Sequence, residues 1–170
     1  MNLILIGYRG TGKSSVAKIL SEKLHAKLIS TDELIVKKAG MGIPEIVEKH
    51  GWEHFRNLES GIVKEIISDD DLIVDSGGGV VLRDENIKSL RKNSKIVLLT
   101  ADTKTIASRI KDGKNRPSLT GKKSFIEEIE EVLKERKPIY DKAADFRVDT
   151  SKLRVSTVAK RIIDWLNRCQ

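Results

Sequence analysis

The sequence predicts an α/β fold in which helices cover both faces of a parallel sheet. Short apolar segments alternate with amphipathic segments along its 170 residues. The apolar segments are rich in valine, isoleucine and leucine with few interruptions, as in strands that are buried on both faces. We expect them to form strands at 2–7, 26–30, 71–75, 95–100 and 145–150. Ligands of such a sheet bind at the carboxyl ends of its strands.

The segments between these strands have helical spacing. Apolar residues recur every three or four positions after the first strand and near the C-terminus, at Val16, Ile19, Leu20, Leu24, Val155, Val158, Ala159, Ile162 and Leu166. Ser124 and Glu127 form a capping box that predicts the start of another helix. We expect Pro138 to stop that helix soon after Arg136. The whole chain, residues 1–170, is expected to be one domain.

Composition excludes several classes of protein. The sequence is 39% hydrophobic and 34% charged, which is typical of a soluble globular chain. No stretch approaches the roughly 20 apolar residues of a membrane span, and the 4% aromatic content argues against a stacking platform for single-stranded nucleic acid. The net charge of +7 favours anionic partners without choosing among nucleotides, nucleic acids and small acids. A single cysteine, Cys169, excludes an internal disulfide and fits a reducing cytoplasm.

The strongest motif is GYRGTGKS, residues 7–14, which satisfies the phosphate-loop pattern between an apolar strand and an amphipathic helix. Its glycines allow backbone N–H groups to turn toward phosphate oxygens at a helix N-terminus. Lys13 would reach the outer phosphates, and the Ser14 hydroxyl would ligate Mg²⁺. The residues expected to bind the nucleotide here are Gly10, Thr11, Gly12, Lys13, Ser14 and Ser15.

The chain is too short for the accessory domains of motor and regulatory NTPases, which favours a small phosphotransferase. Such an enzyme needs a clamp for the acceptor substrate. Asp32 follows the second strand and is a candidate for binding the acceptor hydroxyl, although capping the next helix would also explain it. Arg56 and Arg136 could grip a carboxylate, although Arg56 could equally form a surface salt bridge with Glu59 or Glu53. We expect residues 32–60 to be a helical substrate-binding region.

A phosphotransferase also needs a lid that excludes water. The segment KDGKNRPSLTGKK, residues 111–123, has the glycines and proline of an irregular, mobile loop. Arg116 within it could swing onto the transferring phosphate. An ordinary flexible basic loop explains the same composition.

These motifs together resemble the shikimate kinase family from end to end. The resemblance rests on GYRGTGKS, TDELI, GWEHFRNLES, DSGGGVV, KNRPSL and ERKPIYDKAADFRVDT, in this order and spacing. It implies the nucleoside-monophosphate-kinase-like P-loop fold, a three-layer arrangement with a five-stranded parallel sheet and a lid. It also implies transfer of the γ-phosphate of ATP to the 3-hydroxyl of shikimate, with Mg²⁺.

The resemblance assigns roles to the candidate residues. Asp32 would bind the acceptor hydroxyls, and Lys13 and Arg116 would act on the transferring phosphate. The shikimate carboxylate would bind Arg56 and Arg136, with backbone N–H groups from Gly78 and Gly79. Arg109 would lie against the adenine, with Lys152 or Arg154 on its other side.

The sequence departs from this family at two carboxylate positions. Members usually carry D-x-D after the second strand, and the first Asp serves the hydrated Mg²⁺; this chain has Ser30 there. Asp75, after the third strand, stands where members usually have a small or hydroxyl residue. We hypothesise that Asp75 takes the outer-shell Mg²⁺ role. The alternative is a strand-end residue bonded to nearby backbone.

Two other functions fit parts of the pattern. Another small-molecule kinase of this fold, acting on gluconate or a nucleoside monophosphate, is favoured by Ser30 but not by the paired arginines and triple glycine. A non-catalytic nucleotide-dependent regulator or nucleic-acid-binding protein is favoured only by the positive charge. We expect shikimate as the small-molecule partner, no nucleic-acid or membrane partner, and a monomer.

Overall fold

A computed structural model of the chain describes residues 1–110 and 124–169. A five-stranded sheet lies at its centre, in the order β2-β3-β1-β4-β5, with every neighbouring pair parallel. Its strands are β1 (Asn2–Ile6), β2 (Lys27–Ser30), β3 (Leu72–Asp75), β4 (Ser94–Thr100) and β5 (Phe146–Asp149). Each strand end lies within one residue of its predicted position, so the predicted α/β fold is confirmed.

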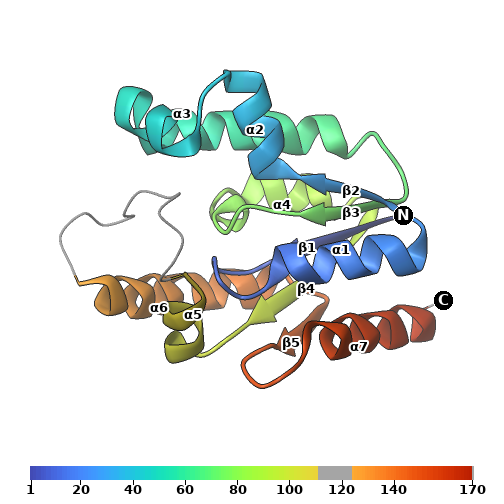
Figure 1. Ribbon diagram of the computed structural model, residues 1–170. Coiled ribbons are helices and arrows are strands. Elements are labelled where there is room, and N and C mark those ends of the chain that lie inside the picture. The colour runs from blue at the N-terminus through green and yellow to red at the C-terminus, as the bar shows by residue number, and fades with distance from the viewer. Residues whose placement is uncertain (111–123, 170) are drawn as a thin grey trace.

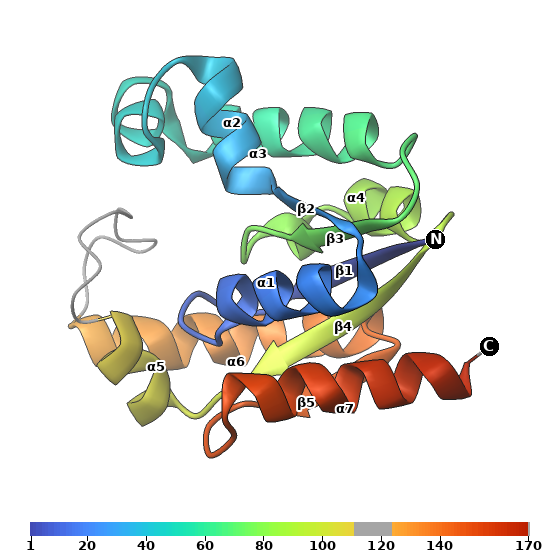
Figure 2. The same ribbon diagram turned by 45° about the vertical axis from the view of Figure 1, so that its right-hand side comes forward.

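Helices cover both faces of this sheet, in three layers (Figures 1 and 2). α1 (Lys13–Leu24) and α7 (Val155–Arg168) lie on one face. α3 (Ile43–Ile66), α4 (Asp84–Leu90) and α6 (Phe125–Ala143) lie on the other, where α2 (Thr31–Ala39) and the short 3₁₀ helix η1 (Val80–Leu82) pack beside them. α5 (Thr103–Ile110) packs against α6. None of the helices in the described residues is long and apolar enough to cross a membrane.

The two faces have separate hydrophobic cores because side chains alternate along each strand. In β1, Leu3 and Leu5 pack against α1 and α7, whereas Ile4 and Ile6 pack against the helices of the opposite face. All four side chains are at most 3% exposed. Burial on both faces explains why the central strands read as continuous apolar runs.

Helix α6 corrects one sequence prediction. The capping box of Ser124 and Glu127 begins the helix as expected, but Pro138 lies inside it and the helix continues to Ala143. Proline removes one backbone donor and disfavours the preceding turn. The helix continues because Tyr140 and Ala143, beyond the proline, are buried in the sheet core. Tertiary packing therefore overrides the local stop signal.

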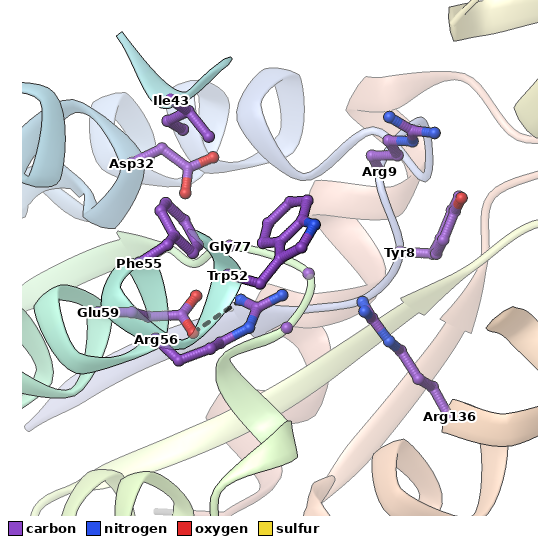
Figure 3. A pocket seen from close by; sticks show the side chains of 12 residues that line it. Tyr8, Arg9, Asp32, Ile43, Trp52, Phe55, Arg56, Glu59, Gly77 and Arg136 are labelled. Atoms are coloured by element: carbon purple, nitrogen blue, oxygen red, sulfur yellow. Dashed lines mark hydrogen bonds and ion pairs between the residues drawn. The ribbon is translucent and has the colours of Figure 1, made fainter. Parts of the chain in front are cut away.

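Helix α3 bends at Gly51, whose φ of 82° lies in the left-handed region that glycine adopts readily. Beyond the bend, the helix presents Trp52, Phe55, Arg56 and Glu59 at spacings of three and four residues, on one face. This face looks toward the carboxyl ends of β1 and β3 (Figure 3).

A matched pair of isoleucine variants tests the placement of the core. Ile4→Ala should lower the free energy of unfolding by about 2–5 kcal/mol, because Ile4 is 1% exposed and its removal leaves a cavity. Ile126→Ala should change it by less than about 0.5 kcal/mol, because Ile126 is 54% exposed. Urea denaturation of both variants measures the difference, and equal losses would contradict the assigned core.

Candidate functional site

The phosphate loop joins β1 to α1 at the centre of the sheet. Gly10 and Gly12 have φ values of 79° and 92°, which only glycine adopts without strain. The Tyr8 carbonyl oxygen accepts hydrogen bonds from the Thr11 N–H at 3.3 Å and the Thr11 hydroxyl at 2.8 Å. Lys13 Nζ donates to the carbonyl oxygens of Gly7 and Tyr8 at 2.8 and 3.1 Å. The loop thus encloses the Lys13 ammonium group at its centre.

Thr150, directly after β5, braces the loop from outside. Its hydroxyl donates to the Thr11 carbonyl oxygen at 2.8 Å, and its N–H donates to the Thr100 carbonyl oxygen at 2.8 Å. Arg109 of α5 donates to the carbonyl oxygens of Gly10 and Thr150, at 3.1 and 2.9 Å. These contacts fix the loop relative to three separate elements.

A shallow pocket beside this brace is a candidate for the nucleotide base. We name it the base pocket; its lining residues are Gly10, Thr11, Gly12, Ser15, Val16, Arg109, Thr150, Leu153, Val155 and Val158. Arg109 lines this pocket, and its expected contact with the adenine stays a prediction. Arg154 is exposed at the N-terminus of α7 and is not part of the lining. Its chain neighbours Leu153 and Val155 line the pocket. The expected place of Lys152 or Arg154 beside the adenine stays a prediction.

A second pocket opens over the phosphate loop. We name it the phosphate pocket, and its lining residues are Arg9, Gly10, Gly12, Lys13, Ser14, Ser15, Ser30, Asp32, Asp75 and Ser76. The Ser14 hydroxyl donates to Asp75 Oδ2 at 2.5 Å. Ser30 is the register partner of Asp75 on the neighbouring strand. The structure therefore places together the three residues that the magnesium hypothesis involves.

Ser30 has a structural role of its own in this pocket. Its hydroxyl caps α2 by accepting a hydrogen bond from the Glu33 N–H at 3.3 Å. Asp32 lies in the first turn of α2 and is not its cap. The capping explanation offered for Asp32 thus applies to Ser30, and Asp32 is left to line the phosphate pocket.

A third pocket lies between the phosphate loop, α3 and α6. We name it the arginine pocket, and it is lined by Tyr8, Arg9, Asp32, Ile43, Trp52, Phe55, Arg56, Glu59, Gly77, Gly78, Gly79 and Arg136. Arg56 and Arg136 enter it from different helices (Figure 3). The Arg56 guanidinium carbon is 5.3 Å from the Trp52 ring centroid and 5.1 Å from that of Phe55. Two guanidinium groups, which can bind a carboxylate with paired hydrogen bonds, thus line one pocket.

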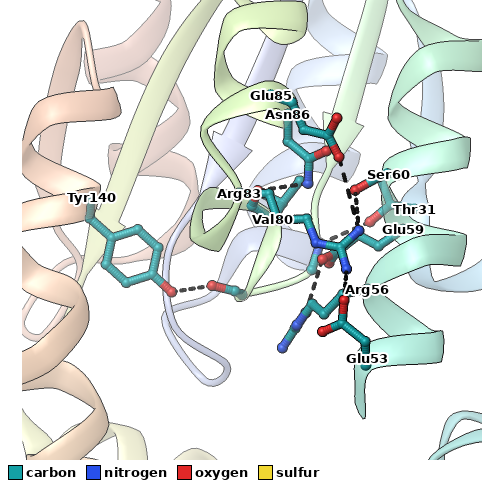
Figure 4. Close-up of polar contacts among 12 residues, drawn as sticks. Thr31, Glu53, Arg56, Glu59, Ser60, Val80, Arg83, Glu85, Asn86 and Tyr140 are labelled. Atoms are coloured by element: carbon teal, nitrogen blue, oxygen red, sulfur yellow. Dashed lines mark hydrogen bonds and ion pairs between the residues drawn. The ribbon is translucent and has the colours of Figure 1, made fainter. Parts of the chain in front are cut away.

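Glu59 holds Arg56 in place. Glu59 Oε2 accepts a hydrogen bond from Arg56 Nη1 at 2.9 Å, and the Glu59 side chain is 0% exposed. Burial raises the pKa of Glu59, while Arg56, Arg136 and Arg83 act to lower it. The other carboxylate considered for Arg56, Glu53, instead pairs with Arg83 at 2.7 Å (Figure 4). The Arg56 ion pair is thus internal and not a surface salt bridge.

The triple glycine, which we name the glycine floor, lines the arginine pocket, and side chains at two of its positions, Gly77 and Gly79, would strike charged groups of the pocket. A Cβ atom at Gly77 would lie 2.8 Å from Glu59 Oε1 and 2.9 Å from Asp32 Oδ1. A Cβ atom at Gly79 would overlap the Arg56 guanidinium. The Gly78 carbonyl oxygen accepts a hydrogen bond from the buried Tyr140 hydroxyl, which fixes the floor to α6.

Sequence reasoning did not place Arg9 in this site, and it considered Glu59 only as a surface partner of Arg56. Arg9 occupies a variable position of the phosphate-loop motif, so the motif itself gives no signal for it. Glu59 is spaced three residues from Arg56 on a helix, which is a signal for a pair but not for burial. Arg116 and the predicted lid lie outside the described residues. Among the described residues, no cluster of three His, Cys, Asp or Glu side chains could hold a metal ion.

Comparisons with known proteins identify the family of the chain. The family model for shikimate kinase matches residues 9–167. A shikimate kinase of Thermodesulfovibrio yellowstonii is 43% identical over 98% of this chain and 95% of its own length. One from Caldanaerobacter subterraneus is 41% identical over 95% of this chain and 94% of its own. The solved structure of Acinetobacter baumannii shikimate kinase in complex with shikimate superimposes with a TM-score of 0.93 at 28% identity, covering 99% and 94% of the two chains.

Two glycine variants test the packing of the pocket floor. Gly79→Ala should lower the free energy of unfolding by about 1–3 kcal/mol, because the added methyl group forces Arg56 out of its contacts. Gly61→Ala is the control: Gly61 lies inside α3 with no atom within 4 Å of the added methyl. It should raise stability by up to about 1 kcal/mol. Denaturation with urea distinguishes them, and a neutral Gly79→Ala would refute the close approach.

Proposed function

The chain belongs to the shikimate kinase family of ATP-dependent phosphotransferases, and we propose that ATP binds its phosphate and base pockets while shikimate binds its arginine pocket. The observation that carries this proposal is the pair of arginines facing each other over a glycine floor, in a pocket that meets the phosphate pocket at Asp32 and Arg9. A compact acid with hydroxyl groups fits that combination of charges. Gluconate and nucleoside monophosphates fit this pair of arginines over a glycine floor less well.

Recognition of shikimate divides between its two ends. Arg56 and Arg136 would bind the carboxylate with charge-assisted hydrogen bonds. Asp32, on the other side of the pocket, would accept a hydrogen bond from an acceptor hydroxyl and so hold its oxygen toward the phosphate pocket. The N–H groups of Gly78 and Gly79 would contribute further donors. Contacts at both ends would fix the position and the orientation of the shikimate ring.

Recognition of ATP rests on the phosphate loop. The loop N–H groups and the N-terminus of α1 would bind phosphate oxygens, and Lys13 would exchange its loop carbonyl partners for the outer phosphates. Arg109 would line the adenine side. Arg116 is assigned to the transferring phosphate by its sequence position alone.

The residues around Ser14 fit a magnesium ion. Mg²⁺ prefers oxygen ligands and keeps several waters, so one hydroxyl, ATP phosphates and one carboxylate reached through water suffice. The Ser14 hydroxyl and Asp75 carboxylate supply these oxygens beside Lys13, and Ser30, already a helix cap, contributes no charge. A bound Mg²⁺ would neutralise charge on the outer phosphates. We propose Asp75 as the outer-shell carboxylate of this chain.

The proposal also includes the domain organisation, the oligomeric state and the location of the protein. Arg56 and Arg136, Asp32 and the glycine floor define a shikimate-binding region within a single domain of residues 1–170. A monomer in the cytoplasm is expected, in keeping with the exposed free thiol of Cys169.

The acceptor is tested by following ADP release with ATP and Mg²⁺. Shikimate should stimulate release strongly, and gluconate, nucleoside monophosphates and water should not. Shikimate methyl ester, which lacks the carboxylate charge, should require at least about tenfold higher concentration, because hydrogen bonds to two guanidinium groups are weakened. Equal use of shikimate and its ester would contradict the arginine clamp, and stimulation by another acceptor would contradict the substrate assignment.

Two variants test whether Asp75 has the magnesium role that relatives give to an Asp at position 30: Asp75→Asn and the double variant Ser30→Asp/Asp75→Ser. Asp75→Asn should weaken Mn²⁺ binding to the ADP complex, measured by electron paramagnetic resonance, by about tenfold, because an acceptor to a metal-bound water loses its charge. The double variant should restore most of the affinity, because positions 30 and 75 are register partners.

The control for this experiment is Asp164→Asn, on the exposed face of α7, which should bind Mn²⁺ like the wild type. Wild-type Mn²⁺ affinity in Asp75→Asn would refute the outer-shell role. Its carboxylate would then serve only the hydrogen bond to Ser14.

A further inference from the structure

Arg9, in the phosphate loop, lies where the two substrates meet. It lines both the phosphate pocket and the arginine pocket, a property it shares with Asp32 alone among the described lining residues. Asp32 and Arg9 enter the arginine pocket from different elements, α2 and the phosphate loop (Figure 3). If ATP and shikimate occupy the two pockets as proposed, the phosphoryl group is transferred close to these two shared residues.

Glu128 of α6 holds the Arg9 guanidinium. Arg9 Nη2 lies 3.3 Å from Glu128 Oε1, and the two side chains are 18% and 5% exposed. The Arg9 guanidinium carbon also lies 5.8 Å from the ring centroid of its neighbour Tyr8. A largely buried ion pair restricts the long arginine side chain to one region of the pocket. Arg9 is therefore positioned and not a freely moving surface cation.

The Arg9 guanidinium has N–H donors that are not used in hydrogen bonds within the described residues. Its Nε is buried and has no hydrogen-bond partner among the described residues. A guanidinium carries five N–H donors, and the bond to Glu128 uses one of them. Buried polar groups are normally hydrogen-bonded, so an unsatisfied donor on a lining residue indicates a ligand acceptor. An anion with several oxygens, such as a phosphate, matches this planar set of donors.

We propose that Arg9 is a further catalytic residue, one that contacts the phosphoryl group during transfer and then the phosphate of the product. In the reaction, the bond between the γ-phosphorus and the bridging oxygen of ATP breaks, a bond to the acceptor oxygen forms, and the hydroxyl proton is released. Lys13 and the magnesium site lie on the ATP side of this path. Arg9 would stabilise the same charge from the acceptor side. The proposal rests on the proposed function of the two pockets.

This role differs measurably from a structural one. If Arg9 only tied the phosphate loop to α6, its loss would weaken stability, or ATP and shikimate binding, without distinguishing shikimate from its phosphorylated product. If Arg9 binds the transferred phosphate, its loss must weaken binding of shikimate 3-phosphate more than binding of shikimate. The ratio of these two dissociation constants is therefore the deciding quantity.

The experiment compares wild type, Arg9→Met and Arg9→Lys by titration with shikimate and with shikimate 3-phosphate. A change in tryptophan fluorescence reports binding, because Trp52 lines the arginine pocket while Trp165, the other tryptophan, packs against Phe146 on the other face of the sheet. Arg9→Met should leave the shikimate dissociation constant within about twofold and raise that of shikimate 3-phosphate by about 10- to 100-fold, the usual range for a lost charge-assisted hydrogen bond. The turnover number should fall at least about tenfold. Arg9→Lys should recover part of both losses.

Two further variants keep the result interpretable. Arg161→Met, on the exposed face of α7, should behave like the wild type. Arg9→Met/Glu128→Gln removes the buried carboxylate that Arg9→Met leaves without its arginine, and so guards against misfolding. Equal effects on shikimate and its phosphate, or none on either, would overturn the role of Arg9. Failure of the wild type to phosphorylate shikimate would instead overturn the proposed function.

Discussion

The buried ion pair between Arg56 and Glu59 is the constraint on which the candidate site depends. A charge of either sign is costly to bury alone, and here each provides the partner of the other. The pair holds the Arg56 guanidinium near the rings of both Trp52 and Phe55. Its volume and charge then dictate the glycines opposite, because any Cβ atom at positions 77 or 79 would meet Glu59 or Arg56. One interaction thus accounts for the spacing of Arg56 and Glu59 on the helix and for two of the three glycines, Gly77 and Gly79.

The parallel sheet brings this pair to the phosphate loop. β3 lies beside β1, so the glycine floor that follows β3 begins next to the loop that follows β1. β2 pairs with the other edge of β3, and Asp32, just after β2, therefore lies near the glycine floor. Helix α6 closes the group from the opposite side with Arg136, Tyr140 and Glu128. Segments far apart in sequence thereby meet because parallel strands end at one edge.

Sequence predicted those features that local pattern determines. Apolar runs located the strands, the glycine motif located the phosphate loop, and Ser124 with Glu127 located the start of α6. Features set by tertiary packing were not accessible in this way. Burial of Tyr140 and Ala143 carries α6 past Pro138, and burial of Glu59 turns an ordinary helical pair into an internal one. Arg9 acquires its position only when β1, α2 and α6 converge.

The most direct test of this account is the affinity of Glu59→Gln for shikimate and for ADP, measured by calorimetry on the folded variant. Glutamine keeps the shape of the side chain and removes the charge that orients Arg56. The account predicts that the shikimate dissociation constant rises about tenfold while ADP binds as in the wild type, since the phosphate loop is braced independently by Thr150 and Arg109. Unchanged affinity for shikimate would contradict the central place given to this ion pair.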